Sequence, residues 1–137
     1  MAQSAEAYVD TSALIAFADR SDSFHDLFRR AFSNSPPLLT TSLVIAEGHG
    51  WFVKRFDSYR GLEFLAMIEA MRPLKTLRTG ADDVAAAALV LRRFSDQDLT
   101  LVDAVGLHIM TERKIRSCWS TDRHLSLTGI PLLIHQI

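Results

Sequence analysis

The sequence predicts an α/β fold of three layers, in which helices flank a mainly parallel central sheet. Short apolar runs with the length of strands alternate with longer segments in which apolar residues recur at helical spacing. The 137 residues suit one compact unit, so residues 1–137 are expected to form a single domain. A hydrophobic fraction of 48% and a charged fraction of 23% are ordinary for a globular protein that builds its core without disulfides.

Two strands and four helices are expected in the first half of the chain. In order, these are a strand at residues 7–9, helices at 12–19 and 24–32, a strand at 38–39, and helices at 43–56 and 59–71. The second helix is supported by apolar residues that recur at helical spacing from Phe24 to Phe32. Thr41 or Ser42 is expected to cap the third helix, because a hydroxyl there can accept a hydrogen bond from a free backbone N–H in the first turn.

The second half begins after Pro73, which ends the preceding helix. The expected elements are a strand at residues 74–77, a helix at 80–94 capped by Thr79, a helix at 100–113, a strand at 117–119, a helical turn near Asp122 and a last strand at 132–134. Asp82 and Asp83 suit the first turn of a helix, where the dipole favours acids. Strands that alternate with helices favour a parallel sheet, in which functional sites form at the carboxyl edge.

The composition of the chain limits the classes of protein to which it can belong. Cys118 is the single cysteine, which excludes an intrachain disulfide and a thiolate zinc cluster and favours a reducing, cytoplasmic location. The N-terminal sequence lacks a signal-peptide pattern, and the longest apolar run, residues 84–91, is too short to cross a membrane. The net charge of −1 argues against a nucleic-acid coat protein. Basic pairs such as Lys54–Arg55 could still line the rim of an enzyme, or be solvated helix faces.

Four acidic residues fall near the carboxyl edge of the predicted sheet. Asp10 ends the first strand, and Asp122 directly follows a late strand. Asp103 lies in the first turn of a helix, and Glu47 lies about one turn into the helix after the second strand. Since the strands of a parallel sheet end at the same edge, the four carboxylates are expected to gather there. Asp96 and Asp98 are interpreted as surface acids.

Gathered carboxylates indicate a metal site. Without basic partners they would repel one another and raise their own pKa values, a conflict that a divalent cation removes. Oxygen ligands, with no His pair at zinc spacing, select a hard ion such as Mg²⁺ or Mn²⁺. The chemistry that suits this ion is phosphoryl transfer, because it lowers the pKa of a bound water and neutralises charge on the phosphate.

Each acid also has a structural explanation. Asp10 could cap the helix that follows it, Asp103 could form a capping box, and Asp122 could cap its own turn. Glu47 is harder to explain in this way. Its apolar neighbours three residues before and four residues after place it on a face that is expected to be buried, where a carboxylate needs a partner.

Four segments carry a resemblance to a known family. In order, they are YVDTSALIAFADRSDSFH, TTSLVIAEGHG, FSDQDLTLVDAVGLHIM and STDRHL. Their order and spacing resemble a PIN domain, most closely the VapC-type toxins of toxin–antitoxin pairs, from Tyr8 to about Leu133. The resemblance implies a PIN-like fold and an endoribonuclease that hydrolyses RNA phosphodiester bonds through a metal-activated water. It matches the quartet to the metal and catalytic positions, with Asp10 and Asp103 as direct ligands of Mg²⁺ or Mn²⁺, and Glu47 and Asp122 completing the site.

The resemblance also implies supporting residues and partners. Ser12 and Thr121 match small polar positions that orient the acids, although Ser12 could instead complete a helix cap. The implied partners are an RNA substrate, a cognate antitoxin and a second copy of the chain in a homodimer, with no membrane. The exposed apolar surface that the two protein partners need is expected near residues 24–32 or 62–68, unless those residues are core. The five histidines are expected to be solvated or partly packed, and Gly50 has no explanation at this stage.

Other readings fit less well. A haloacid-dehalogenase phosphatase would carry a second Asp where Ser12 stands, and a receiver domain would carry an acidic pair where Thr11 follows Asp10. The main alternative is a PIN-like module that binds RNA or protein without cutting, which has no need of four converging acids. A nuclease acting on DNA also remains open, and the sequence does not identify the RNA target.

Overall fold

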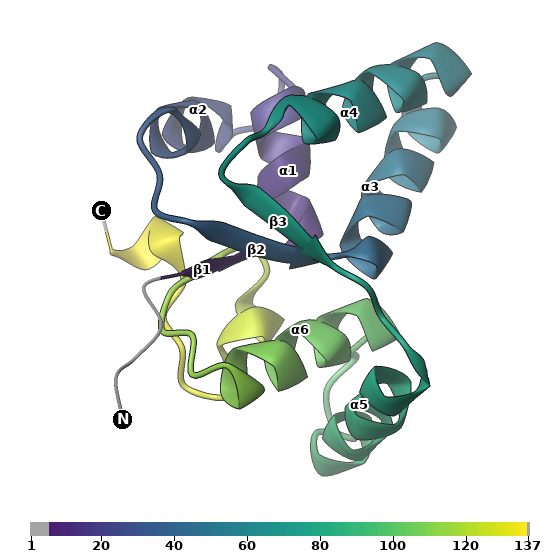
Figure 1. Ribbon diagram of the computed structural model, residues 1–137, viewed down its shortest axis with the longest axis vertical. Helices are drawn as coiled ribbons and strands as arrows, with labels where there is room; N and C mark the ends of the chain where they lie inside the picture. Colours follow the sequence, from purple (N-terminus) through teal and green to yellow (C-terminus); the bar gives the residue numbers. More distant parts are fainter. Residues whose placement is uncertain (1–5, 137) are drawn as a thin grey trace.

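A four-stranded parallel sheet forms the centre of the computed structural model, which describes residues 6–136 (Figure 1). Its strands are β1 (Ala7–Val9), β2 (Leu38–Thr41), β3 (Leu74–Leu77) and β4 (Cys118–Trp119), arranged in the order β3-β2-β1-β4. Every pairing between them is parallel. The carboxyl ends of the strands therefore meet at one edge, and the expected α/β fold is confirmed.

Helices cover both faces of this sheet and complete three layers (Figure 1). One face carries α1 (Thr11–Ala18), α2 (His25–Ser33), α3 (Ser42–Arg55) and α4 (Ser58–Ala70). The other face carries α5 (Ala81–Arg93) and α6 (Leu101–Glu112). Two short 3-10 helices in the described part of the chain, η1 (Arg123–Ser126) and η2 (Leu133–His135), follow β4.

The alternation of side chains along β1 divides the core in two. Tyr8 belongs to a buried cluster with Leu107 of α6, whereas Ala7 and Val9 belong to a second cluster with Phe28 of α2. Successive residues of a strand point to opposite faces, so a strand covered on both sides is apolar throughout. Because β1 is buried on both faces, the residue that follows it is held in a fixed position.

Each helix from α1 to α6 starts within one residue of its predicted start, but the residue that caps α5 differs from the prediction. Thr41 caps α3 as expected, since its side chain accepts a hydrogen bond from the N–H of Val44 at 3.3 Å. The prediction that Thr79 caps α5 is wrong, because Gly80 occupies the cap position. The hydroxyl of Thr79 is buried without a hydrogen-bond partner among the described residues, and the N–H of Thr79 donates to Ser42 Oγ at 3.2 Å.

The strand expected at residues 132–134 is also wrong. Leu132 forms a single parallel bridge with Cys118, and the chain then turns into η2. The N–H of His135 donates to the carbonyl of Leu132 at 3.0 Å, which closes a 3-10 turn. Because the 3-10 turn begins at Leu132, the pairing with β4 ends after one residue.

Gly48 lets α3 pack closely on α4. A Cβ atom at Gly48 would collide with the ring of Phe64, whose Cε2 would lie 2.9 Å away. We expect Gly48→Ala to destabilise the fold by about 1–3 kcal/mol, measured by urea unfolding. The matched control is Gly50→Ala on the same helix, where an added Cβ meets nothing within 4 Å. This control should gain about 0.5–1 kcal/mol, and equal stability of the two variants would contradict the prediction.

Candidate active site

A pocket of about 590 Å³ opens at the carboxyl edge of the sheet, and all four predicted acids line it. Asp10 directly follows β1, and Asp122 lies between β4 and η1. Asp103 lies in the first turn of α6, and Glu47 lies on α3. The structure therefore brings together residues that are spread over most of the chain, as the parallel topology predicts.

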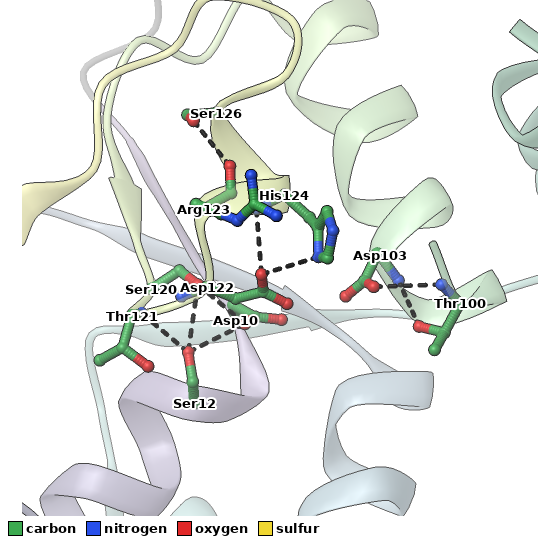
Figure 2. Close-up of polar contacts among 10 residues, drawn as sticks. All are labelled: Asp10, Ser12, Thr100, Asp103, Ser120, Thr121, Asp122, Arg123, His124 and Ser126. Atoms are coloured by element: carbon green, nitrogen blue, oxygen red, sulfur yellow. Dashed lines mark hydrogen bonds and ion pairs between the residues drawn. The ribbon is translucent and has the colours of Figure 1, made fainter. Parts of the chain in front are cut away.

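Asp10 is buried and held by two hydroxyl groups (Figure 2). Its Oδ2 accepts hydrogen bonds from Ser12 Oγ at 3.0 Å and from Ser120 Oγ at 2.9 Å. Its backbone N–H donates to the carbonyl of Trp119 at 3.0 Å, which ties the end of β1 to β4. Asp10 occupies the N-cap position of α1, but its side chain forms no capping hydrogen bond. The alternative that its carboxylate serves as a helix cap is therefore wrong.

The same two hydroxyls connect Asp10 to the turn after β4. Ser12 Oγ accepts the N–H of Thr121, and Ser120 Oγ accepts the N–H of Asp122, both at 2.9 Å. Ser12 thus orients the cluster rather than capping α1. Thr121 contributes its backbone, while its side chain points away from Asp10 (Figure 2). The sequence analysis missed Ser120, although its place directly after β4 in the segment STD was a usable signal.

Asp103 and Asp122 combine a capping role with their place in the pocket. Asp103 Oδ2 accepts the N–H of Thr100 at 3.1 Å, and the N–H of Asp103 donates to Thr100 Oγ1 at 3.2 Å, which confirms the capping box. Asp122 Oδ1 accepts the N–H of His124 at 3.0 Å and caps η1. These bonds use one oxygen of each carboxylate, so the other oxygen is open to a ligand.

His124 lies against the acids and was missed by the sequence analysis. Its Nδ1 is 3.0 Å from Asp122 Oδ1, and its ring lies between Asp122 and Asp103 (Figure 2). One ligand atom from each of these three residues lies within 4.8 Å of the others, so this group can hold a metal ion. The signal in the sequence was its position two residues after Asp122, in the same turn.

Glu47 lines the pocket from an exposed position. The expectation that it lies on a buried face is wrong: Val44 is buried and Trp51 is half-buried, but the side chain of Glu47 is exposed. Glu47 lies beside the apolar stripe of α3 and not within it, so its side chain reaches solvent at the rim of the pocket. Burial therefore gives no reason to assign Glu47 a partner, and its site role stays a prediction.

The electrostatics of the pocket suit a divalent cation. The pKa of Asp10 is raised from 3.8 to about 6, mainly by burial and also by the charge of Asp103, against the lowering effect of the two serine hydroxyls. Within residues 6–136, neither Asp10 nor Asp103 forms an ion pair with a basic residue. The hydroxyl of Thr11, which also lines the pocket, is buried and has no hydrogen-bond partner among the described residues. This set of oxygen donors with one imidazole fits Mg²⁺ or Mn²⁺.

The raised pKa predicts a pH-dependent affinity for the cation. A cation at this carboxylate requires its ionised form, so protonation of Asp10 near pH 6 would compete with binding. We expect the Mn²⁺ affinity to fall by about tenfold for each pH unit below about 6. Isothermal titration calorimetry across this range measures the effect. An affinity that stays constant from neutral pH down to about pH 5 would contradict the prediction.

Comparison with known proteins gives consistent results for sequence and fold. A family model described as the PIN domain matches residues 7–130. The 23S rRNA-specific endonuclease VapC20 from two strains of Mycobacterium tuberculosis is 25% identical over 123 residues, which cover 89% of this chain and 93% of the relative. The crystal structure of Mycobacterium tuberculosis VapC20, described as a sarcin-ricin loop cleaving toxin, superposes with a TM-score of 0.83 at 21% identity. It covers 91% of this chain and 96% of that one.

Proposed function

The chain belongs to the PIN-domain family, and from this premise we propose that it is a metal-dependent endoribonuclease, the toxin of a type II toxin–antitoxin pair. The observation that carries the proposal is the convergence of four carboxylates in one pocket, with the buried Asp10 at its base. A relative that acts on 23S rRNA supports RNA as the substrate class. Residues 1–137 form one such domain in this proposal.

The site residues take separate roles in this proposal. Asp10 and Asp103 bind Mg²⁺ or Mn²⁺ directly, and Glu47 and Asp122 complete the site. When bound, the ion lowers the pKa of a water molecule and offsets charge that builds on the phosphate. The hydroxyl of Ser12 fixes the carboxylate of Asp10, so that the oxygens are oriented before the ion arrives.

Further hydrogen bonds extend this orientation to the turn after β4. Ser120 holds Asp10 and the backbone of Asp122 at once, and Thr121 anchors the turn through its N–H to Ser12. His124 holds the carboxylate of Asp122 in place through the 3.0 Å contact. Groups that orient metal ligands in this way commonly affect metal affinity by about 10- to 100-fold.

The proposal includes a cognate antitoxin and a homodimer in the cytoplasm. Tyr59 and Leu62 of α4 are 67% and 63% exposed, which supports a partner surface on that helix. Helix α2 instead fits the alternative that its apolar residues belong to the core, because Phe28 is completely buried. A measured mass of a monomer at micromolar concentration would contradict the dimer. None of the helices within residues 6–136 has the length and apolar character that a membrane crossing needs.

Cleavage of a mixed RNA pool tests the proposed function. Purified protein free of any partner is incubated with Mn²⁺, with Mg²⁺ or with chelator, beside Asp10→Asn. Cutting that depends on the metal and is lost in the variant would support the nuclease. A folded protein that neither cuts RNA nor melts at a higher temperature with Mn²⁺ would contradict it and favour the non-catalytic module.

A further inference from the structure

One wall of the acidic pocket carries residues that the proposed metal chemistry does not use. They are Gly50, Trp51 and Lys54 of α3, which line the pocket beyond Glu47. Their spacing places them along one side of the helix. We propose that this wall binds an unpaired nucleotide beside the scissile phosphate of RNA, with Lys54 at a phosphate and Trp51 stacked on the base. The inference rests on the proposed function and specifies how the substrate is held.

Lys54 supplies positive charge where the pocket is otherwise acidic. Among the described residues that line this pocket, Lys54 is the basic one, beside four carboxylates. Its side chain is exposed, and within residues 6–136 no carboxylate forms an ion pair with it. A polyanion approaching four acids is repelled unless a cation holds one of its phosphates. An unpaired lysine at the edge of the acids is suited to that contact.

Trp51 is half-buried, and its ring is oriented by contacts with neighbouring side chains. Its ring meets the ring of Phe52 edge-on at a centroid distance of 4.9 Å and 80°, and that of Phe56 at 6.2 Å and 70°. The guanidinium of Arg55 lies 5.7 Å from the centre of the indole. Packing against the two phenylalanines explains these ring contacts, but it does not explain why Trp51 stands in the wall of the pocket. Aromatic rings flanked by basic groups are platforms on which unpaired bases stack.

Gly50 gives an independent indication of a ligand. Glycine weakens a helix relative to alanine, and a glycine in mid-helix is usually retained for close packing. Gly48 has such a reason in the ring of Phe64, but a Cβ at Gly50 would meet nothing within 4 Å. Since Gly50 lines the pocket between Glu47 and Lys54, the missing side chain leaves room for a bound molecule. The proposed nucleotide accounts for a glycine that the fold itself does not require.

Binding of two short RNAs tests the subsite. One is a labelled hairpin with an unpaired loop, and the other is the same stem as a closed duplex; all proteins carry Asp10→Asn to prevent cutting. Lys54→Ala should weaken binding of both and reduce the slope of log affinity against log salt by about 0.7, the value of one phosphate contact. Trp51→Leu should weaken hairpin binding by about 5- to 100-fold and spare the duplex, whereas Trp51→Phe should retain most of it.

Matched controls separate binding from folding. Lys75→Ala removes an exposed cation outside the pocket and should not change RNA affinity. Gly50→Ala should raise the melting temperature and yet weaken RNA binding. In the chain with Asp10 intact, Lys54→Ala and Trp51→Leu should keep the Mn²⁺-dependent rise in melting temperature. That result would show that the metal centre remains formed.

The outcomes distinguish this inference from the proposed function. If Lys54→Ala and Trp51→Leu bind both RNAs as tightly as the parent while the wild type cuts RNA, the subsite is wrong and the nuclease stands. If both variants lose binding and the wild type cuts no RNA, the assignment to a scissile phosphate is wrong. Loss of hairpin binding in Trp51→Leu, with cutting by the wild type, would support the proposal.

Discussion

Asp10→Asn is expected to stabilise the metal-free protein near pH 8 and to abolish both Mn²⁺ binding and RNA cleavage. The carboxylate of Asp10 is 5% exposed, and burial raises its pKa from 3.8 to about 6. Keeping it ionised therefore costs the metal-free fold about 3 kcal/mol. The asparagine retains an oxygen that can accept from Ser12 and Ser120, and it carries no charge.

The sign of the pH dependence follows from the raised pKa. The folded state binds the proton of Asp10 more tightly than the unfolded state does. The stabilisation of the fold by this bound proton is therefore complete below about pH 4 and is lost as the pH rises through about 6. The free energy of unfolding of Asp10→Asn should exceed that of the wild type by about 3 kcal/mol near pH 8 and equal it near pH 4. Urea unfolding in the presence of chelator measures this difference. A difference that does not change with pH would contradict this account.

The metal reverses the order of stability. Mn²⁺ at a concentration of about 1,000 times its dissociation constant should stabilise the wild type by about 4.1 kcal/mol and Asp10→Asn hardly at all. Cleavage should fall by at least about 10³-fold, the effect of losing about 4 kcal/mol of transition-state stabilisation. The control is Asp96→Asn, an exposed acid outside the pocket, which should change neither quantity. A variant of Asp10 that still gains stability from Mn²⁺ would place the metal elsewhere.

Ser120→Ala is expected to lower Mn²⁺ affinity and cleavage by about 10- to 100-fold. The hydroxyl of Ser120 is completely buried; it donates to Asp10 and accepts the N–H of Asp122, both at 2.9 Å. Its removal takes away a bond that lowers the pKa of Asp10, and it leaves the N–H of Asp122 without its acceptor. Metal titration and single-turnover cleavage measure the two effects.

Two comparisons show whether Ser120 acts through Asp10. Ser126→Ala removes another hydroxyl of the same region, one that donates to the carbonyl of Arg123 at 2.7 Å, and should leave metal binding unchanged. In chelator, Ser120→Ala should shift the Asp10-dependent change in stability to a higher pH, because the lost hydrogen bond lowers the pKa of Asp10. An unchanged pH profile together with weaker metal binding would mean that Ser120 acts on Asp122 alone.

The sequence by itself determined the elements whose signals are local. Strand β3 has the predicted bounds, and Thr41 caps α3, because alternation, capping hydroxyls and proline breaks act over a few residues. Local signals failed in two places. The side chain of Thr79 does not cap α5, where the N–H of Thr79 bonds to the distant Ser42, and the chain after Leu132 closes a local 3-10 turn in place of a strand.

The convergence of the acids was also determined by the sequence, since parallel strands end at one edge wherever they stand in the sheet. The strand order was decided only by the tertiary structure. It places β1 beside β4, so that Ser120 reaches Asp10 across 110 positions of sequence. The exposure of Glu47 and the contact of His124 with Asp122 depend on how helices and turns pack, not on spacing along the chain. Local patterns specify which residues reach the edge, and long-range packing specifies which side chains touch there.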